Sequence, residues 1–115
     1  MISKRNSREL DVRTDVEGGK GMISFDKINS EEIKPSNVRK YAYAKLEPGA
    51  VVGFHKHFGE SETFYILSGK ALYSDNGTEV ELVAGDTTYT PDGEGHSIAN
   101  IGDTDLEFMM LIVVD

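Results

Sequence analysis

The sequence contains no cysteine and no tryptophan, and only three histidines and three prolines occur among its 115 residues. Without cysteine the chain can form no disulfide, no thiolate metal site and no iron-sulfur cluster, and it has no cysteine nucleophile. A bound metal ion would therefore need nitrogen and oxygen ligands. The only imidazole nitrogens come from His55, His57 and His96, so the positions of these residues are the central question.

Positive charge is also scarce. Twelve lysines and arginines stand against twenty aspartates and glutamates, which gives a formal net charge of -8 at pH 7. Because such a chain is repelled by phosphate backbones and anionic lipid, we expect no nucleic-acid partner and no membrane partner. The longest apolar run, residues 108–114, is far shorter than the roughly 20 residues of a transmembrane helix, and no signal-peptide pattern is visible. We therefore expect a cytoplasmic protein.

Long helical patterns are absent as well. Short apolar or alternating runs are separated at regular intervals by turn-forming pairs such as Pro48-Gly49 and Asn76-Gly77. This punctuation is typical of an all-β sandwich or barrel. Eight strands with hairpin-length links favour a double-sheet jelly roll. The predicted strands cover residues 40–46, 51–57, 62–67, 70–74, 78–82, 86–90, 96–99 and 106–114.

The first part of the chain is less regular. Residues 1–20 are charged and weakly patterned, so we predict an arm that ends in a glycine-rich turn. Residues 22–25 should form a short strand. Asn29 offers an N-cap with Glu32 at the third helical position, which favours one helical turn before Pro35.

The last predicted strand has no polar face. Residues 108–114 are apolar at every position, so both faces of the strand need cover. Because the chain has no helix to spare, we predict a homodimer with this strand, or the arm before Gly18, at the interface. Cover by the N-terminal arm of the same chain is the alternative.

The three histidines and one glutamate fall on neighbouring strands of the predicted barrel. His55 and His57 are two apart in one strand, so their side chains share a face. Glu62 opens the next strand, and His96 begins a later one. Two antiparallel hairpins can bring all four to one end of a barrel, where three imidazoles and a carboxylate would bind a divalent ion. The alternative is that they are ordinary residues on solvated strands and loops.

The same residues lie within two sequence motifs. Residues 49–69 read G-x5-H-x-H-x4-E-x6-G, which resembles the first motif of the cupin superfamily. Residues 85–100 read G-x5-P-x-G-x2-H-x3-N, which resembles the second motif with every position matched. The chain thus resembles the small single-domain cupins, or monocupins.

This resemblance implies a fold, a domain plan and a ligand set. The implied fold is an all-β double-stranded β-helix, the cupin jelly-roll barrel, with an N-terminal arm. Residues 1–115 would form a single cupin domain, with the arm and first strands in 1–38 and the barrel with both motifs in 39–115. One divalent metal ion per chain would be bound by His55, His57, Glu62 and His96. Iron, manganese, nickel, cobalt, copper and zinc all suit such ligands.

The reaction does not follow from the family, because cupins include dioxygenases, isomerases, decarboxylases, sugar sensors and storage proteins. With every histidine assigned to the metal, no imidazole remains as a free general base. Metal-centred chemistry on a small organic molecule is therefore favoured, with a dioxygenase-like reaction ahead of isomerisation or decarboxylation. A noncatalytic small-molecule binding protein is the alternative. Arg39 and Lys45 could meet a substrate carboxylate, although such strand residues are more often solubilising charges.

Overall fold

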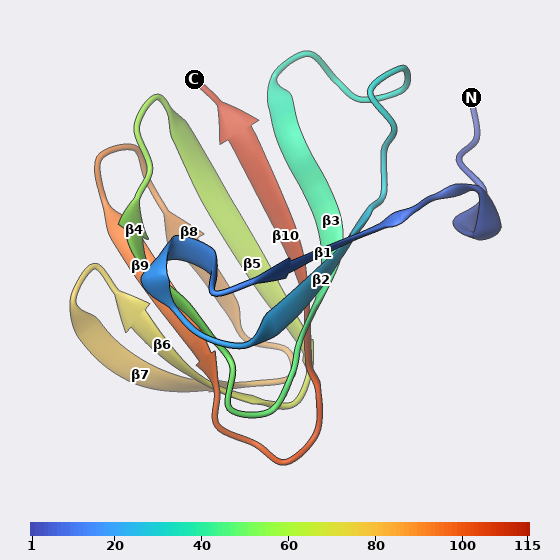
Figure 1. Cartoon of the computed structure of the whole chain (residues 1–115). Coiled ribbons are helices and arrows are strands. Elements are labelled where there is room, and N and C mark those ends of the chain that lie inside the picture. The colour runs from blue at the N-terminus through green and yellow to red at the C-terminus, as the bar shows by residue number, and fades with distance from the viewer.

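Two antiparallel β-sheets make up almost the whole chain in the computed structural model, which describes residues 1–115 (Figure 1). Two short 3₁₀ turns, η1 (Arg5–Ser7) and η2 (Val16–Gly18), are the only helical segments, and neither is long and apolar enough to cross a membrane. The strands are β1 (Leu10–Thr14), β2 (Met22–Lys27), β3 (Val38–Leu46), β4 (Val51–Lys56), β5 (Glu60–Ser68), β6 (Lys70–Asp75), β7 (Thr78–Val83), β8 (Thr87–Thr90), β9 (Gly95–Asn100) and β10 (Leu106–Val114).

The strand order is that of a jelly roll. One sheet has six strands in the order β1-β2-β3-β10-β5-β8, and the other has four in the order β4-β9-β6-β7. The last strand lies in the middle of the larger sheet, between β3 and β5, and pairs with both along its length (Figure 1). The all-β jelly-roll fold predicted from the sequence is therefore confirmed.

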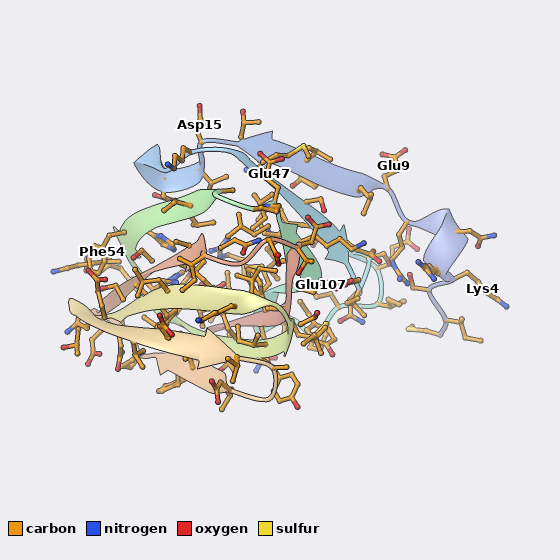
Figure 2. The ribbon with its side chains drawn as sticks, turned by 90° about the horizontal axis from the view of Figure 1, so that it is seen from below. Lys4, Glu9, Asp15, Glu47, Phe54 and Glu107 are labelled. Atoms are coloured by element: carbon orange, nitrogen blue, oxygen red, sulfur yellow. The ribbon has the colours of Figure 1, made fainter.

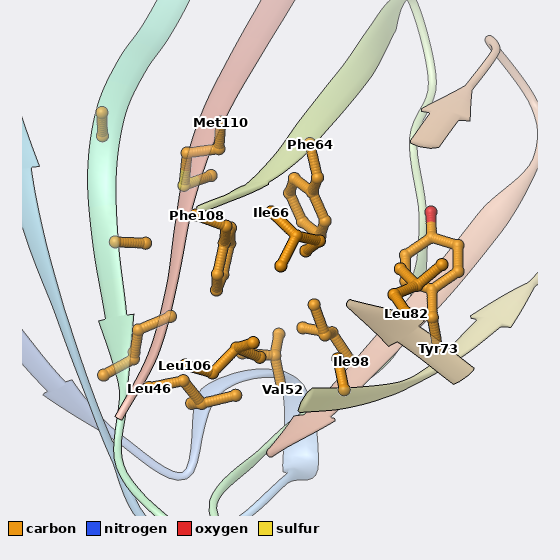
Figure 3. Packing of buried hydrophobic residues seen from close by; sticks show 14 of the residues in the cluster. Leu46, Val52, Phe64, Ile66, Tyr73, Leu82, Ile98, Leu106, Phe108 and Met110 are labelled. Carbon is orange, nitrogen blue, oxygen red and sulfur yellow. The ribbon is translucent and has the colours of Figure 1, made fainter. Parts of the chain in front are cut away.

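The hydrophobic core fills the space between the two sheets (Figure 3). Strand β10 alternates strictly, with Leu106, Phe108, Met110 and Ile112 buried and the residues between them half-buried. The ring centroids of Phe64 and Phe108 lie 4.8 Å apart at the centre of this cluster. The apolar run at the C-terminus is thus a core strand whose second face points away from the barrel interior.

The N-terminal region differs from the sequence prediction in two details. The predicted arm contains a strand that was not recognised, β1, which pairs with β2 from Leu10 opposite Asp26 to Thr14 opposite Met22. The helical turn before Pro35 is absent; a single turn forms instead, in which the Ile33 amide donates to the Ser30 carbonyl at 3.1 Å. One such bond closes a turn without the consecutive bonds that a helix requires.

Turn η2 packs directly on strand β4, and two glycines permit this contact. A Cβ on Gly53 would lie 2.0 Å from the Glu17 carbonyl oxygen, and a Cβ on Gly19 would lie 1.9 Å from the Val51 carbonyl oxygen. Lys20 and Val51 exchange two backbone hydrogen bonds of 3.0 and 2.7 Å at the same point. The N-terminal segment is thereby fixed beside strand β4, which carries His55 and ends directly before His57.

Candidate metal centre

The four predicted ligand residues come together at one end of the barrel. His55 lies in β4, His57 directly follows it, Glu62 lies in β5 and His96 lies in β9. Pairing of β4 with β9 places His55 opposite His96. One ligand atom from each of the four residues lies within 4.8 Å of every other. His57, Glu62 and His96 are buried, with 6%, 2% and 1% of their surface exposed, and His55 is half-buried.

The turn after His57 is fixed by the neighbouring loop. The His57 amide donates to the Glu94 carbonyl at 3.0 Å, and the His57 carbonyl accepts from the Gly93 amide at 2.7 Å. Gly59 has a φ of 73°, which favours glycine, and its amide donates to the Asp92 carboxylate at 2.8 Å. These bonds join the two cupin-like motifs and set the direction of the His57 side chain.

The shortest contacts in the cluster converge on Glu62. Its Oε1 lies 3.0 Å from His57 Nε2 and 2.9 Å from His96 Nε2, and these two nitrogens are 3.1 Å apart. The other carboxylate oxygen, Oε2, is buried and has no hydrogen-bond partner. A buried, unpartnered carboxylate oxygen is costly unless a cation accompanies it.

Each imidazole is held from behind through its Nδ1 atom. His57 Nδ1 lies 2.8 Å from the Glu60 carboxylate, and His55 Nδ1 lies 2.8 Å from the Gly53 carbonyl. Both partners only accept hydrogen bonds, so in these two rings Nδ1 carries the proton and the neutral form has its lone pair on Nε2. Metal-binding histidines are commonly oriented in this way by a carboxylate or a carbonyl group.

The third imidazole has hydroxyl partners. His96 Nδ1 lies 2.8 Å from the Tyr73 hydroxyl and 3.0 Å from that of Thr90, and all three side chains are buried. Behind His57, the Arg39 guanidinium donates to both oxygens of Glu60 at 2.8 Å. The carboxylate that orients His57 is therefore itself fixed by an ion pair.

The protonation states of Glu62 and His96 favour metal binding. Burial alone would raise the pKa of Glu62, but hydrogen bonds with His57 and His96 outweigh it and lower the pKa to about 2. Burial lowers the pKa of His96, which keeps that ring neutral. The contact with Glu62 raises the pKa of His57, which works against its neutral form, so metal binding must compete with a proton at that ring. A carboxylate and neutral imidazoles are the ligand forms that a divalent ion requires. The donor set and its unpartnered oxygen fit such an ion.

A cavity of about 190 Å³ opens beside this cluster, with His55, His57 and Glu62 in its wall. Most of the remaining wall is apolar, and Phe64, Phe108 and Met110 are among its residues. Arg13, Glu17, Arg39 and Lys40 supply charged groups to it. The cavity size matches a molecule of only a few heavy atoms.

The structure separates the two basic residues that the sequence proposed as carboxylate contacts. Arg39 lines the cavity, whereas Lys45 lines a different hollow, together with Tyr43 and Met109. Sequence reasoning missed Arg13 and Lys40. The sequence could have indicated Lys40. Along the strand it alternates in step with Ala42 and Ala44, whose side chains face inward, and a charged residue is unexpected on that face.

Comparison with known proteins places these features in a family. The model of the cupin domain matches residues 42–114, which is more than half of the sequence and includes all four residues of the cluster. The chain belongs to the cupin family. The resemblance seen in the two motifs is thereby confirmed.

Two proteins named for oxalate are similar to this chain. An oxalate-binding protein of Thermotoga maritima is 45% identical over 101 residues, with 88% of this chain and 84% of that protein covered. An oxalate decarboxylase of Bacillus subtilis is 35% identical over 104 residues, but this chain spans only 26% of its length. Among solved structures, a Thermotoga maritima protein described as a predicted oxalate decarboxylase is 40% identical, covers both chains completely and superposes with a TM-score of 0.92.

Proposed function

We propose that this cupin binds one divalent metal ion through His55, His57, Glu62 and His96 and uses it to bind a small carboxylate, with oxalate as the leading candidate. The observation that carries the proposal is the convergence of the four ligand atoms on a small cavity with three cationic side chains in its wall. The oxalate-binding relative, which matches over most of both chains, supports the same ligand class.

The charge of the site suits an anionic ligand. A divalent ion bound there would supply a Lewis acid for a carboxylate oxygen. Three neutral imidazoles and one carboxylate cancel only half of the charge of such an ion, so the site keeps a net positive charge. The apolar wall around Phe64 and Phe108 lowers the local dielectric constant, which strengthens the attraction between this charge and an anion.

The residues of the cavity favour ligand binding without a chemical reaction. Once the histidines are ligands, Glu17 is the one remaining carboxylate in the cavity wall, and it lies on the exposed turn η2. Decarboxylation is the second candidate, because relatives described as oxalate decarboxylases share about a third of the aligned residues. The dioxygenase-like reaction and the isomerase reaction stay predictions from the sequence.

Calorimetry with oxalate tests the proposed function. The protein is first treated with a chelator, dialysed and divided into a metal-free sample and a sample reloaded with Mn(II). We expect oxalate to bind the reloaded sample at one site per chain and not to bind the metal-free sample. Equal binding to both samples would show that the metal is not part of the site. Release of carbon dioxide from oxalate by the reloaded protein would favour the decarboxylase candidate.

We also propose that the protein is a homodimer, and that residues 1–115 act as one cupin domain within it. The outer face of the larger sheet carries Met109 between Tyr43 and Tyr65 of the adjacent strands. The chain's own N-terminal segment borders this face, where Arg8 and Leu10 line a hollow with Met109, and its first residues project away from the barrel (Figure 2). A second copy is our candidate for the cover of the rest of the face. A cytoplasmic location stays a prediction.

A further inference from the structure

Lys40 occupies an inward-facing position that a charged residue seldom takes. It pairs with Ile112 of β10, and Ile112 in turn pairs with Glu62 of β5. Lys40 and Glu62 therefore lie at the same level on the inner face of the larger sheet, two strand spacings apart, or about 10 Å between their Cα atoms. The ligand cluster and this lysine thus occupy two sides of one cavity.

The Lys40 ammonium has no carboxylate partner. No aspartate or glutamate oxygen lies within 4.0 Å of it, and its Nζ instead lies 3.3 Å from the centroid of the Phe25 ring. The other two cations of the cavity are paired, Arg13 with Asp11 at 3.1 Å and Arg39 with Glu60 at 2.8 Å. Lys40 is therefore the cation in this wall whose charge is free to meet a ligand.

Positive charge continues from the cavity to the surface. A second hollow of about 160 Å³ adjoins the first and shares Arg13, Arg39 and Lys40 with it. Lys27 and Lys34 add two further cations, and Glu31 is the one acidic residue in its wall. On a chain with a net charge of -8, this local positive patch favours the approach of small anions toward the cluster.

We propose that Lys40 anchors the second carboxylate of a dianionic ligand whose first carboxylate lies at the metal centre. The site then selects small dicarboxylates over monocarboxylates of similar size, because only a dianion satisfies both charges at once. Burial lowers the pKa of Lys40 to about 8, which still leaves the side chain charged at pH 7. The cavity volume of about 190 Å³ favours small dicarboxylates. This inference rests on the proposed function and identifies Lys40 as the residue that selects dicarboxylates.

The test compares Lys40→Met with Lys45→Met in the Mn(II)-loaded protein. Methionine keeps an unbranched apolar stem over Phe25 and removes the charge. Lys45 lies in the same strand on the outer face, so its variant is the matched control. Calorimetry with oxalate as the dianion and formate as the monoanion is accompanied by measurement of the metal content of each sample.

We expect Lys40→Met to lose at least about tenfold in oxalate affinity, while its formate affinity and metal content match those of the wild type. Lys45→Met should bind both anions as the wild type does. Wild-type oxalate affinity in a metal-loaded Lys40→Met variant would overturn the role of Lys40 and leave the proposed function intact. Failure of the metal-loaded wild type to bind oxalate would instead contradict the proposed function.

A measurement on the wild-type protein covers the case in which Lys40→Met does not fold. With lysine labelled at Cε and diamagnetic Zn(II) at the site, nuclear magnetic resonance follows the titration of Lys40 without and with oxalate. A carboxylate beside the ammonium should raise its titration midpoint by at least about one pH unit. An unchanged midpoint with oxalate bound would refute the anchor.

Discussion

At the scale of single residues, Glu60 shows how the chain prepares His57 to bind a metal. Its carboxylate accepts the Nδ1 proton of His57 at 2.8 Å and is itself held by Arg39. The Glu60→Gln variant weakens both contacts, so we expect the affinity for Mn(II) or Zn(II) to fall by about 10- to 100-fold. Competition with a chromogenic chelator measures this, and Glu79→Gln on the exposed strand β7 is the control. Equal affinities in the two variants would mean that Glu60 has no orienting role.

The charge of Lys40 gives the site a pH dependence. Burial is the largest cause that lowers its pKa to about 8; Lys27 and Arg13 act in the same direction, and Asp11 and Glu62 oppose it. A lysine is charged below its pKa, so oxalate affinity should be complete near pH 7 and should decline as the pH rises through about 8 to 9. Calorimetry of the metal-loaded protein across this range measures the decline. In Lys40→Arg, which keeps its charge, the profile should be flat, and a decline there would assign the dependence to another group.

The sequence predicted the cluster residues well and the cavity charges poorly. His55 and His57 are two apart within the strand predicted over residues 51–57, and strand geometry predicts that both lie on one face, although the observed strand β4 ends at Lys56. Glu62 and His96 lie beside them because of strand pairing. Strand geometry alone does not predict this pairing, but the two family motifs indicated it. Arg13 could not be found, because its strand was not recognised and its position in the cavity wall follows from the pairing of β1 with β2.

At the scale of elements, the contact between η2 and β4 sets the mouth of the cavity. In the Gly53→Ala variant the new Cβ would meet the Glu17 carbonyl oxygen at 2.0 Å, and backbone atoms at this distance must move. We expect a loss of about 1–3 kcal/mol in the free energy of unfolding, seen as a lower Tm by calorimetry. Gly102→Ala is the control, because its nearest neighbour would be 3.5 Å away. Equal Tm values in the two variants would show that η2 is not packed on β4 in solution.

The strands that sequence analysis found and missed differ in their surroundings. Most strands from β3 onward are bounded by a glycine-containing turn, and long strands such as β3 and β10 bury every second residue, so their patterns are visible. Strand β1 is an edge strand in which Leu10 and Val12 are exposed. Its sequence therefore lacks the alternation of buried and exposed residues from which a strand is predicted. Its structure depends on β2, a tertiary context that local sequence does not contain.

At the scale of the whole molecule, the outer face of the larger sheet predicts self-association. Leu111 is half-buried at the centre of this face, opposite Tyr41 and Thr63 of the flanking strands. The Leu111→Lys variant would place a charge in the proposed interface, so we expect it to be monomeric at concentrations where the wild type is dimeric. Light scattering measures both, with Val83→Lys on the exposed edge strand β7 as control. A monomeric wild type at micromolar concentration would contradict the homodimer.

The central claim is that four residues from three regions of the barrel bind one metal ion per chain. Elemental analysis of protein that has been loaded with Mn(II) or Zn(II) and dialysed tests it most directly, with single alanine variants of the cluster histidines and Glu62→Gln measured alongside. We predict about one ion per wild-type chain and strongly reduced occupancy in every variant, with the β-type circular dichroism spectrum retained. Full occupancy in all four variants, or no bound metal in the wild type, would contradict the account.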